Sequence, residues 1–266
     1  MLILGNEQPV RAALKYSPFV TFIVVAVVTL SVLYKGMLPI FSEGRLKCLT
    51  GNNSFFVAAG IGTLMAILSR YFIGLHLENK ASLSLSDQLR SVERVFAPLV
   101  IITSCSIAFA HGANDVANSI GPLAAIVDIV SSGTIKMRVQ VPTWVLAMGG
   151  AGIVVGLATY GYRVMDTMGK KITELTPSRG VAADLATLIV VLVCTLWKLP
   201  VSTTHTVVGA ILGIGLARGL SGVNSRITRQ IFSAWFITVP VAVILSMALF
   251  CIGRIFLFET IRSVFA

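Results

Sequence analysis

Charged residues are scarce in this chain, where they make up 12% of the 266 residues, against roughly 25% in an ordinary soluble domain. Hydrophobic residues make up 56%, and the mean hydropathy is +0.89. This composition excludes an ordinary soluble domain. It predicts a protein that resides in a lipid bilayer, where each crossing helix needs about 20 mostly apolar residues.

Groups typical of enzyme and metal sites are also scarce. The sequence has three histidines and four cysteines, and no two cysteines have the C-x-x-C spacing of metal and redox sites. Paired acidic motifs and the nucleophile elbow of hydrolases are missing as well. We therefore predict that the chain is not an enzyme and needs no cofactor.

Long uncharged runs predict six transmembrane helices, at residues 18–34, 54–69, 96–110, 141–162, 181–197 and 231–250. Two further apolar segments, 120–131 and 207–217, are too short to cross a bilayer alone. The expected fold class is all-α, a polytopic transmembrane helical protein whose residues 1–266 form a single transmembrane domain.

Basic residues outnumber acidic ones and give a formal net charge of +10. They lie mainly in the short connections between apolar runs, as expected of a protein that faces anionic headgroups and not of one that binds nucleic acid. Because nearly every connection carries basic residues, the sequence leaves orientation open. The longest connection, residues 75–94, is expected to be a solvated connector or an interfacial helix that leads into the next span near Pro98.

A polar segment, HGANDVANSIGP at residues 111–122, interrupts the apolar pattern. An ionised aspartate at the bilayer centre costs about 2.5 to 3.5 kcal/mol, so Asp115 is expected to have a partner or a function. In a helix, Asn114, Asp115 and Asn118 fall on adjoining faces of one turn. Their oxygen atoms and single negative charge suit a sodium ion or a proton, and the glycines and proline around them would let the helix break. The alternative is a buried hydrogen-bond cluster that holds helices together.

A second polar segment, PVSTTHT, occupies residues 200–206. Ser202, Thr203 and Thr204 supply three hydroxyl groups just after Pro200, where a new helical segment can start. Free amides and the positive end of the helix dipole make such a start an anion site, and hydroxyl groups would complete it for a tetrahedral oxyanion. The alternative is an ordinary N-cap.

We predict that four other ionisable residues do not bind the ligand chiefly themselves. We expect His205 and His111 to hydrogen-bond the ligand-holding groups and not chiefly the ligand itself. Asp128 and Asp184 lie near the ends of apolar runs, where a carboxylate can reach water or a helix N-terminus, and are predicted to be structural.

At the segments GANDVAN (112–118) and PVSTTH (200–205) the sequence resembles the Pit-type inorganic phosphate transporter family, and TPSRG (176–180) and KYSPF (15–19) match its pattern too. The resemblance implies broken or re-entrant helices, symport of phosphate with sodium or protons, and a location in the plasma membrane, the inner membrane of a bacterium. It assigns phosphate to Ser202, Thr203, Thr204, Asp115 and Asn118, and the coupling cation, the only metal ion expected, to Asn114, Asp115 and Asn118.

The family's transporters combine two inverted repeats, each with one copy of both motifs, whereas this chain shows one copy of each. It is therefore expected to correspond to the C-terminal half, as one repeat of an inverted-repeat fold. Its expected partner is a second copy or a separate chain that supplies the N-terminal half. Two other functions stay open, a sulfate permease of the same family and a truncated membrane subunit that does not transport.

Overall fold

The computed structural model of the chain describes residues 8–34, 53–77, 80, 82–136, 139–219 and 222–255. These residues form helices, and no β-strand occurs among them. The α-helices are α1 (Pro9–Val32), α3 (Asn53–Leu77), α4 (Leu85–Ser132), α5 (Thr143–Gly156), α6 (Tyr162–Asp166), α7 (Pro177–Leu196), α8 (Thr203–Ala217) and α9 (Ser225–Gly253). Two π-helical segments, Leu157–Gly161 and Thr167–Lys171, extend α5 and α6 into one long helical stretch.

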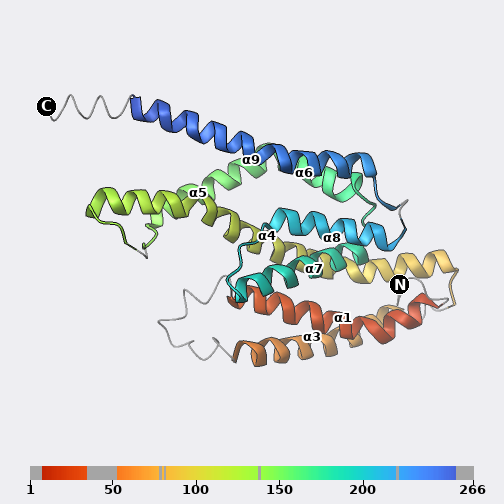
Figure 1. Cartoon of the computed structure of the whole chain (residues 1–266). Helices are drawn as coiled ribbons and strands as arrows, with labels where there is room; N and C mark the ends of the chain where they lie inside the picture. Colours follow the sequence, from red (N-terminus) through yellow and green to blue (C-terminus); the bar gives the residue numbers. More distant parts are fainter. Residues whose placement is uncertain are drawn as a thin grey trace.

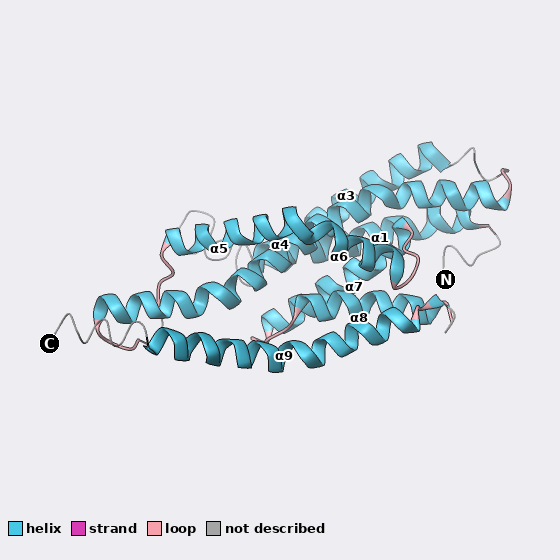
Figure 2. Ribbon diagram, turned by 90° about the horizontal axis from the view of Figure 1, so that it is seen from above, coloured by secondary structure: helices cyan, strands magenta, loops and turns pink. Residues whose placement is uncertain are grey.

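Six of the described helical stretches are long and apolar enough to cross a membrane. The predicted all-α, multi-pass membrane fold is therefore confirmed. In Figures 1 and 2, α9 lies at the edge of the molecule opposite α3, and α1, α7 and α8 lie between them.

One apolar cluster fixes how the first helices pack. It joins Val10 of α1, Leu77 of α3, Val92 and Phe96 of α4, and Val181 of α7, all of them buried. The beginning of α1, the end of α3 and the beginnings of α4 and α7 therefore lie together at one end of the molecule. This end is called the core end below.

The course of helix α4 differs from the predicted architecture. The chain is helical throughout residues 111–122, so the break expected there is not found, and the predicted segments 96–110 and 120–131 belong to one helix. Its 48 residues span about 70 Å at 1.5 Å per residue, more than the roughly 30 Å of a hydrocarbon core. The helix continues past Pro122, which removes one amide and leaves the carbonyl of Asn118 without its helical partner.

The connection predicted at residues 75–94 is mostly helical. Helix α3 continues to Leu77, and α4 begins at Leu85. Ser84 caps α4 by accepting a hydrogen bond from the amide of Asp87 at 3.4 Å. The amphiphilic part of the connection is therefore the first turns of the same helix that carries the polar segment.

Helices α7 and α8 form a hairpin. Lys198 lies in the turn with a φ of 57°, in the left-handed region, and α8 begins at Thr203, where a new helical segment was expected after Pro200. Its 15 residues give a length of about 22 Å, too short to cross alone. The hairpin thus places the start of α8 next to α4, where Thr203 contacts Asp115.

A carboxylate joins α7 to α4. One oxygen atom of Asp184 accepts hydrogen bonds from the hydroxyl groups of Thr103 at 2.6 Å and Ser104 at 2.7 Å. The other predicted structural aspartate, Asp128, pairs with Lys136 at 3.0 Å near the end of α4. Asp184 therefore fixes the position of α7 along α4.

Replacing Asp184 by alanine is expected to destabilise the protein by about 1–2 kcal/mol, because the hydroxyl groups of Thr103 and Ser104 lose a charged acceptor. Thermal unfolding in detergent, followed by tryptophan fluorescence, measures the change. Asp166→Ala is the matched control, since Asp166 forms exposed ion pairs with Lys170 and Lys171 and exposed pairs contribute little. Equal melting temperatures for the two variants would contradict this role of Asp184.

Candidate functional site

The α4 side of the candidate site is a contact between a histidine and an aspartate one helical turn apart. The Nε2 atom of His111 lies 2.7 Å from one carboxylate oxygen of Asp115, and the side chains are 36% and 45% exposed. Residues four apart lie on the same helix face, so the pair forms within α4 without help from another helix. Its partial exposure leaves both side chains accessible to a ligand.

The α8 side is a capped helix start. Ser202 accepts a hydrogen bond from the amide of His205 at 3.3 Å, and its hydroxyl group lies 2.6 Å from the Nδ1 atom of the same histidine. The N-cap interpretation of the sequence therefore applies to Ser202. First-turn amides have no partner within their own helix, so this end of α8 keeps the positive character that attracts anions.

The two polar segments meet through the threonines that follow the cap. The hydroxyl group of Thr203 donates to the second oxygen atom of Asp115 at 3.3 Å, and that of Thr204 lies 3.4 Å from the Nε2 atom of His111. Thr203 is buried, whereas Thr204 is exposed. We call His111, Asp115, Thr203 and Thr204 the α4–α8 site.

The remaining predicted residues lie around this site. Asn114 is partly buried beside Asp115, and Asn118 is exposed on the next turn. Because Pro122 has no amide hydrogen, the carbonyl oxygen of Asn118 is left without its helical donor. Within the described residues, no three His, Cys, Asp or Glu side chains form a metal-binding group. A cation at this place would therefore depend on carboxylate, amide and carbonyl oxygen atoms.

One contact at the site was not predicted from the sequence. The ring of His205 packs on that of Trp235 of α9, with centroids 3.9 Å apart, and Phe232 contacts the same tryptophan at 4.8 Å. His205 is thus held by Ser202 and Trp235, and no local pattern links a tryptophan in α9 to this histidine. His111 contacts Asp115 and Thr204, two of the residues predicted to bind the ligand.

Comparison with known proteins places these motifs in context. The model of the phosphate transporter family matches residues 1–246. The chain belongs to the phosphate transporter family. As a member of this family it is a multi-pass membrane protein and not an enzyme.

Two curated relatives are named as a phosphate permease and a phosphate transporter. A "Putative phosphate permease" of Thermococcus kodakarensis is 44% identical over 248 residues, which cover 93% of this chain and 58% of that protein. The chloroplastic inorganic phosphate transporter 2-1 of Arabidopsis thaliana is 48% identical over 162 residues, 60% of this chain and 28% of that protein.

A solved structure described as the sodium-dependent phosphate transporter matches with a TM-score of 0.67 and 32% identity. The match covers 90% of this chain and 56% of that structure's chain. This chain therefore spans a little more than half the length of the solved structure and of the first curated relative.

Proposed function

We propose that this chain takes part in the membrane transport of inorganic phosphate together with a coupling cation. The observation that supports it best is the contact between Thr203 at the start of α8 and Asp115 in α4. It brings an anion-attracting helix end within hydrogen-bond distance of a carboxylate. Phosphate would bind the hydroxyl groups of Thr203 and Thr204 and the first-turn amides of α8.

The same contact gives a physical reason for coupling. An anion bound at α8 would lie close to the negative charge of Asp115, and this repulsion is strong where water is scarce. A sodium ion or a proton on Asp115 would offset it, with Asn114 and the carbonyl group of Asn118 as further oxygen ligands. The free energy of cation binding would then favour phosphate binding, and phosphate would favour the cation equally.

We also propose that a second polypeptide completes the transport path. A second copy of this chain, or a separate chain that supplies the other repeat, would close the site from the opposite side in the plasma membrane, the inner membrane of a bacterium.

Radiolabelled phosphate uptake into liposomes that contain the purified chain tests the proposal. Sodium and pH gradients are imposed separately, and liposomes without protein serve as the background. We expect uptake driven by one of the two gradients, which identifies the coupling ion. If inserted, folded protein shows neither uptake nor phosphate binding, the proposed function is wrong for this chain alone, and the measurement is repeated with a second chain present.

Sulfate is the competing substrate, because it offers the same tetrahedral oxygen atoms. Monohydrogen phosphate also has an O–H donor, which a carboxylate acceptor such as Asp115 would favour, whereas sulfate has none at neutral pH. We expect Asp115→Asn to reduce the preference for phosphate over sulfate by about tenfold, the loss of one discriminating hydrogen bond. Displacement of bound radiolabelled phosphate by sulfate measures it, and an unchanged displacement curve would rule this explanation out.

A further inference from the structure

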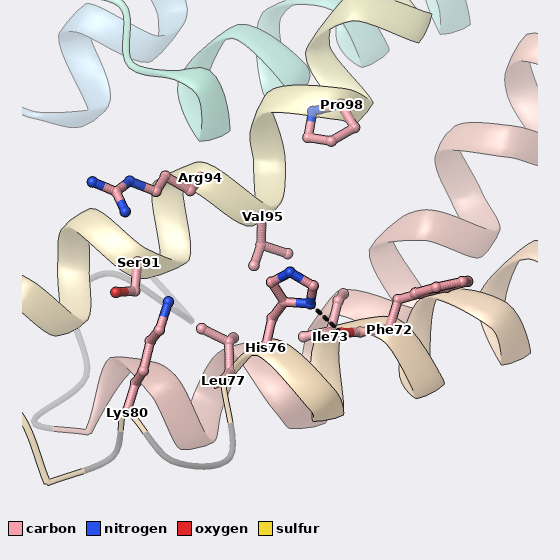
Figure 3. Close-up of a pocket in the computed structure, with 9 residues that line it drawn as sticks. All are labelled: Phe72, Ile73, His76, Leu77, Lys80, Ser91, Arg94, Val95 and Pro98. Atoms are coloured by element: carbon pink, nitrogen blue, oxygen red, sulfur yellow. Dashed lines mark hydrogen bonds between the residues drawn. The ribbon is translucent and has the colours of Figure 1, made fainter.

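A pocket of about 330 Å³ lies at the core end, between the last turns of α3 and the first turns of α4. His76, Lys80 and Arg94 give it a basic rim, and Ile73, Leu77 and Val95 give it an apolar floor. In Figure 3, Arg94, Ser91 and Lys80 lie on one side of the pocket, Leu77, His76 and Val95 lie in the middle, and Ile73, Phe72 and Pro98 lie on the other side. The ring of His76 is oriented within α3 by a 3.2 Å contact with the carbonyl oxygen of Phe72.

The charges on this rim are available to a ligand. Among the described residues, neither Lys80 nor Arg94 forms an ion pair with a carboxylate. Glu93, the acidic neighbour of Arg94, is occupied elsewhere: its two oxygen atoms accept hydrogen bonds from the amide and hydroxyl groups of Ser178, at 2.9 and 2.8 Å. The described lining residues include no acidic side chain, so the pocket favours an anion.

The pocket changes from polar to apolar along the membrane normal. The apolar span of α4 begins at Val95, directly after Arg94, and the apolar residues of α3 end at Leu77, shortly before Lys80. The basic groups therefore lie at headgroup depth and the floor extends toward the hydrocarbon. An isolated phosphate ion would satisfy the rim and leave the floor empty, whereas a molecule with an anionic head and an acyl chain fits both.

Basic side chains are also frequent around the pocket, although Asp87, Glu93 and Glu174 lie at the same end of the molecule. Further basic side chains flank the helices that meet at the core end: Arg11, Lys15, Arg90 and Arg179. Basic residues gather on the cytoplasmic side of membrane proteins, where the leaflet contains anionic lipids.

From these observations we infer that the pocket between α3 and α4 binds an anionic glycerophospholipid, with its phosphate group on Lys80 and Arg94 and an acyl chain on the apolar floor. The lipid would bridge α3 and α4 at the point where the connection between them leaves the membrane. This inference does not depend on the proposed phosphate transport, because it uses none of the residues of the α4–α8 site.

The test uses the whole purified chain in detergent and a fluorescent short-chain phosphatidylglycerol, whose binding is followed by anisotropy. Each basic residue near a membrane surface contributes about fivefold to the affinity for anionic lipid, so we expect Lys80→Gln with Arg94→Gln to weaken binding roughly 25-fold. Arg90→Gln with Arg11→Gln removes two charges from the same end outside the pocket and is expected to leave most of the binding. Val95→Trp fills the floor, keeps every charge, and is also expected to weaken binding.

Three outcomes would overturn the inference. Equal affinity in the pocket and control double variants would show that the lipid follows overall charge only. Unchanged affinity in Val95→Trp would show that no acyl chain enters. Displacement of the probe by millimolar inorganic phosphate as effectively as by unlabelled phosphatidylglycerol would identify a site for the free ion. Each variant counts as folded if it elutes as a single symmetric peak in size-exclusion chromatography and its helical circular dichroism is unchanged.

Discussion

Phosphate binding is expected to fall at least about 100-fold when Thr203→Val and Thr204→Val are combined, because two hydroxyl donors to a charged ligand are lost, each contributing about 1.5–3 kcal/mol. Valine keeps the shape of threonine, so the loss can be assigned to the hydroxyl groups. Radiolabelled phosphate binding to the purified chain measures it. Gradient-driven uptake should fall in parallel.

Thr206→Val is the matched control for this double variant. Thr206 lies on the first turns of the same helix, but its hydroxyl group donates to the carbonyl oxygen of Ser202 at 2.8 Å and so serves the helix itself. We expect phosphate binding close to that of the unmodified chain. Strong binding by the Thr203→Val and Thr204→Val variant would instead place the anion elsewhere and remove the basis for the α4–α8 site.

The second large effect concerns Asp115. Asp115→Asn keeps the size of the side chain and removes its charge, so the cation loses its attractive partner and phosphate no longer needs a cation to offset repulsion. We expect the dependence of phosphate binding on sodium concentration or on pH to disappear, and gradient-driven uptake to fall about 100-fold, as for the loss of an ionic contact of about 2.7 kcal/mol.

Asp128→Asn controls for the loss of a carboxylate from α4. Asp128 pairs with Lys136 at the far end of the helix, and its replacement is expected to preserve the cation dependence. Titrations of phosphate binding at several sodium concentrations and pH values distinguish the two variants. A cation dependence that persists in Asp115→Asn would show that the coupling ion binds at a different place.

Much of the fold could be predicted because membrane insertion depends on local sequence. A stretch of apolar residues of sufficient length forms a helix in lipid whatever its neighbours are, since its amides must bond within the segment. Each of the six predicted spans accordingly matches a described helix to within two residues at its ends or lies inside it, although α1, α3 and α4 extend well beyond the runs expected for them. The break expected at residues 111–122 was wrong because glycine and proline permit a break without requiring one.

The candidate site could be predicted in part for the same reason. Asp115 and the hydroxyl cluster are conspicuous because polar groups at membrane depth are costly. Which of the three hydroxyl groups caps α8 depends on where that helix begins, and which faces α4 depends on the rotation of α8 against α4. The start of α8 assigns Ser202 to His205, and the packing of α8 on α4 assigns Thr203 to Asp115.

The sequence by itself determined the class of the protein, the approximate positions of its spans and the positions of two polar segments among them, because length, hydropathy and the cost of burying polar groups act within a short stretch of chain. Only the tertiary structure decided that these segments meet, that Trp235 holds His205, and that α3 and α4 enclose a pocket with a basic rim. Each of these depends on side-chain packing between helices that are distant in sequence or separated by a turn, and in lipid such packing is set by the fit of the helix surfaces.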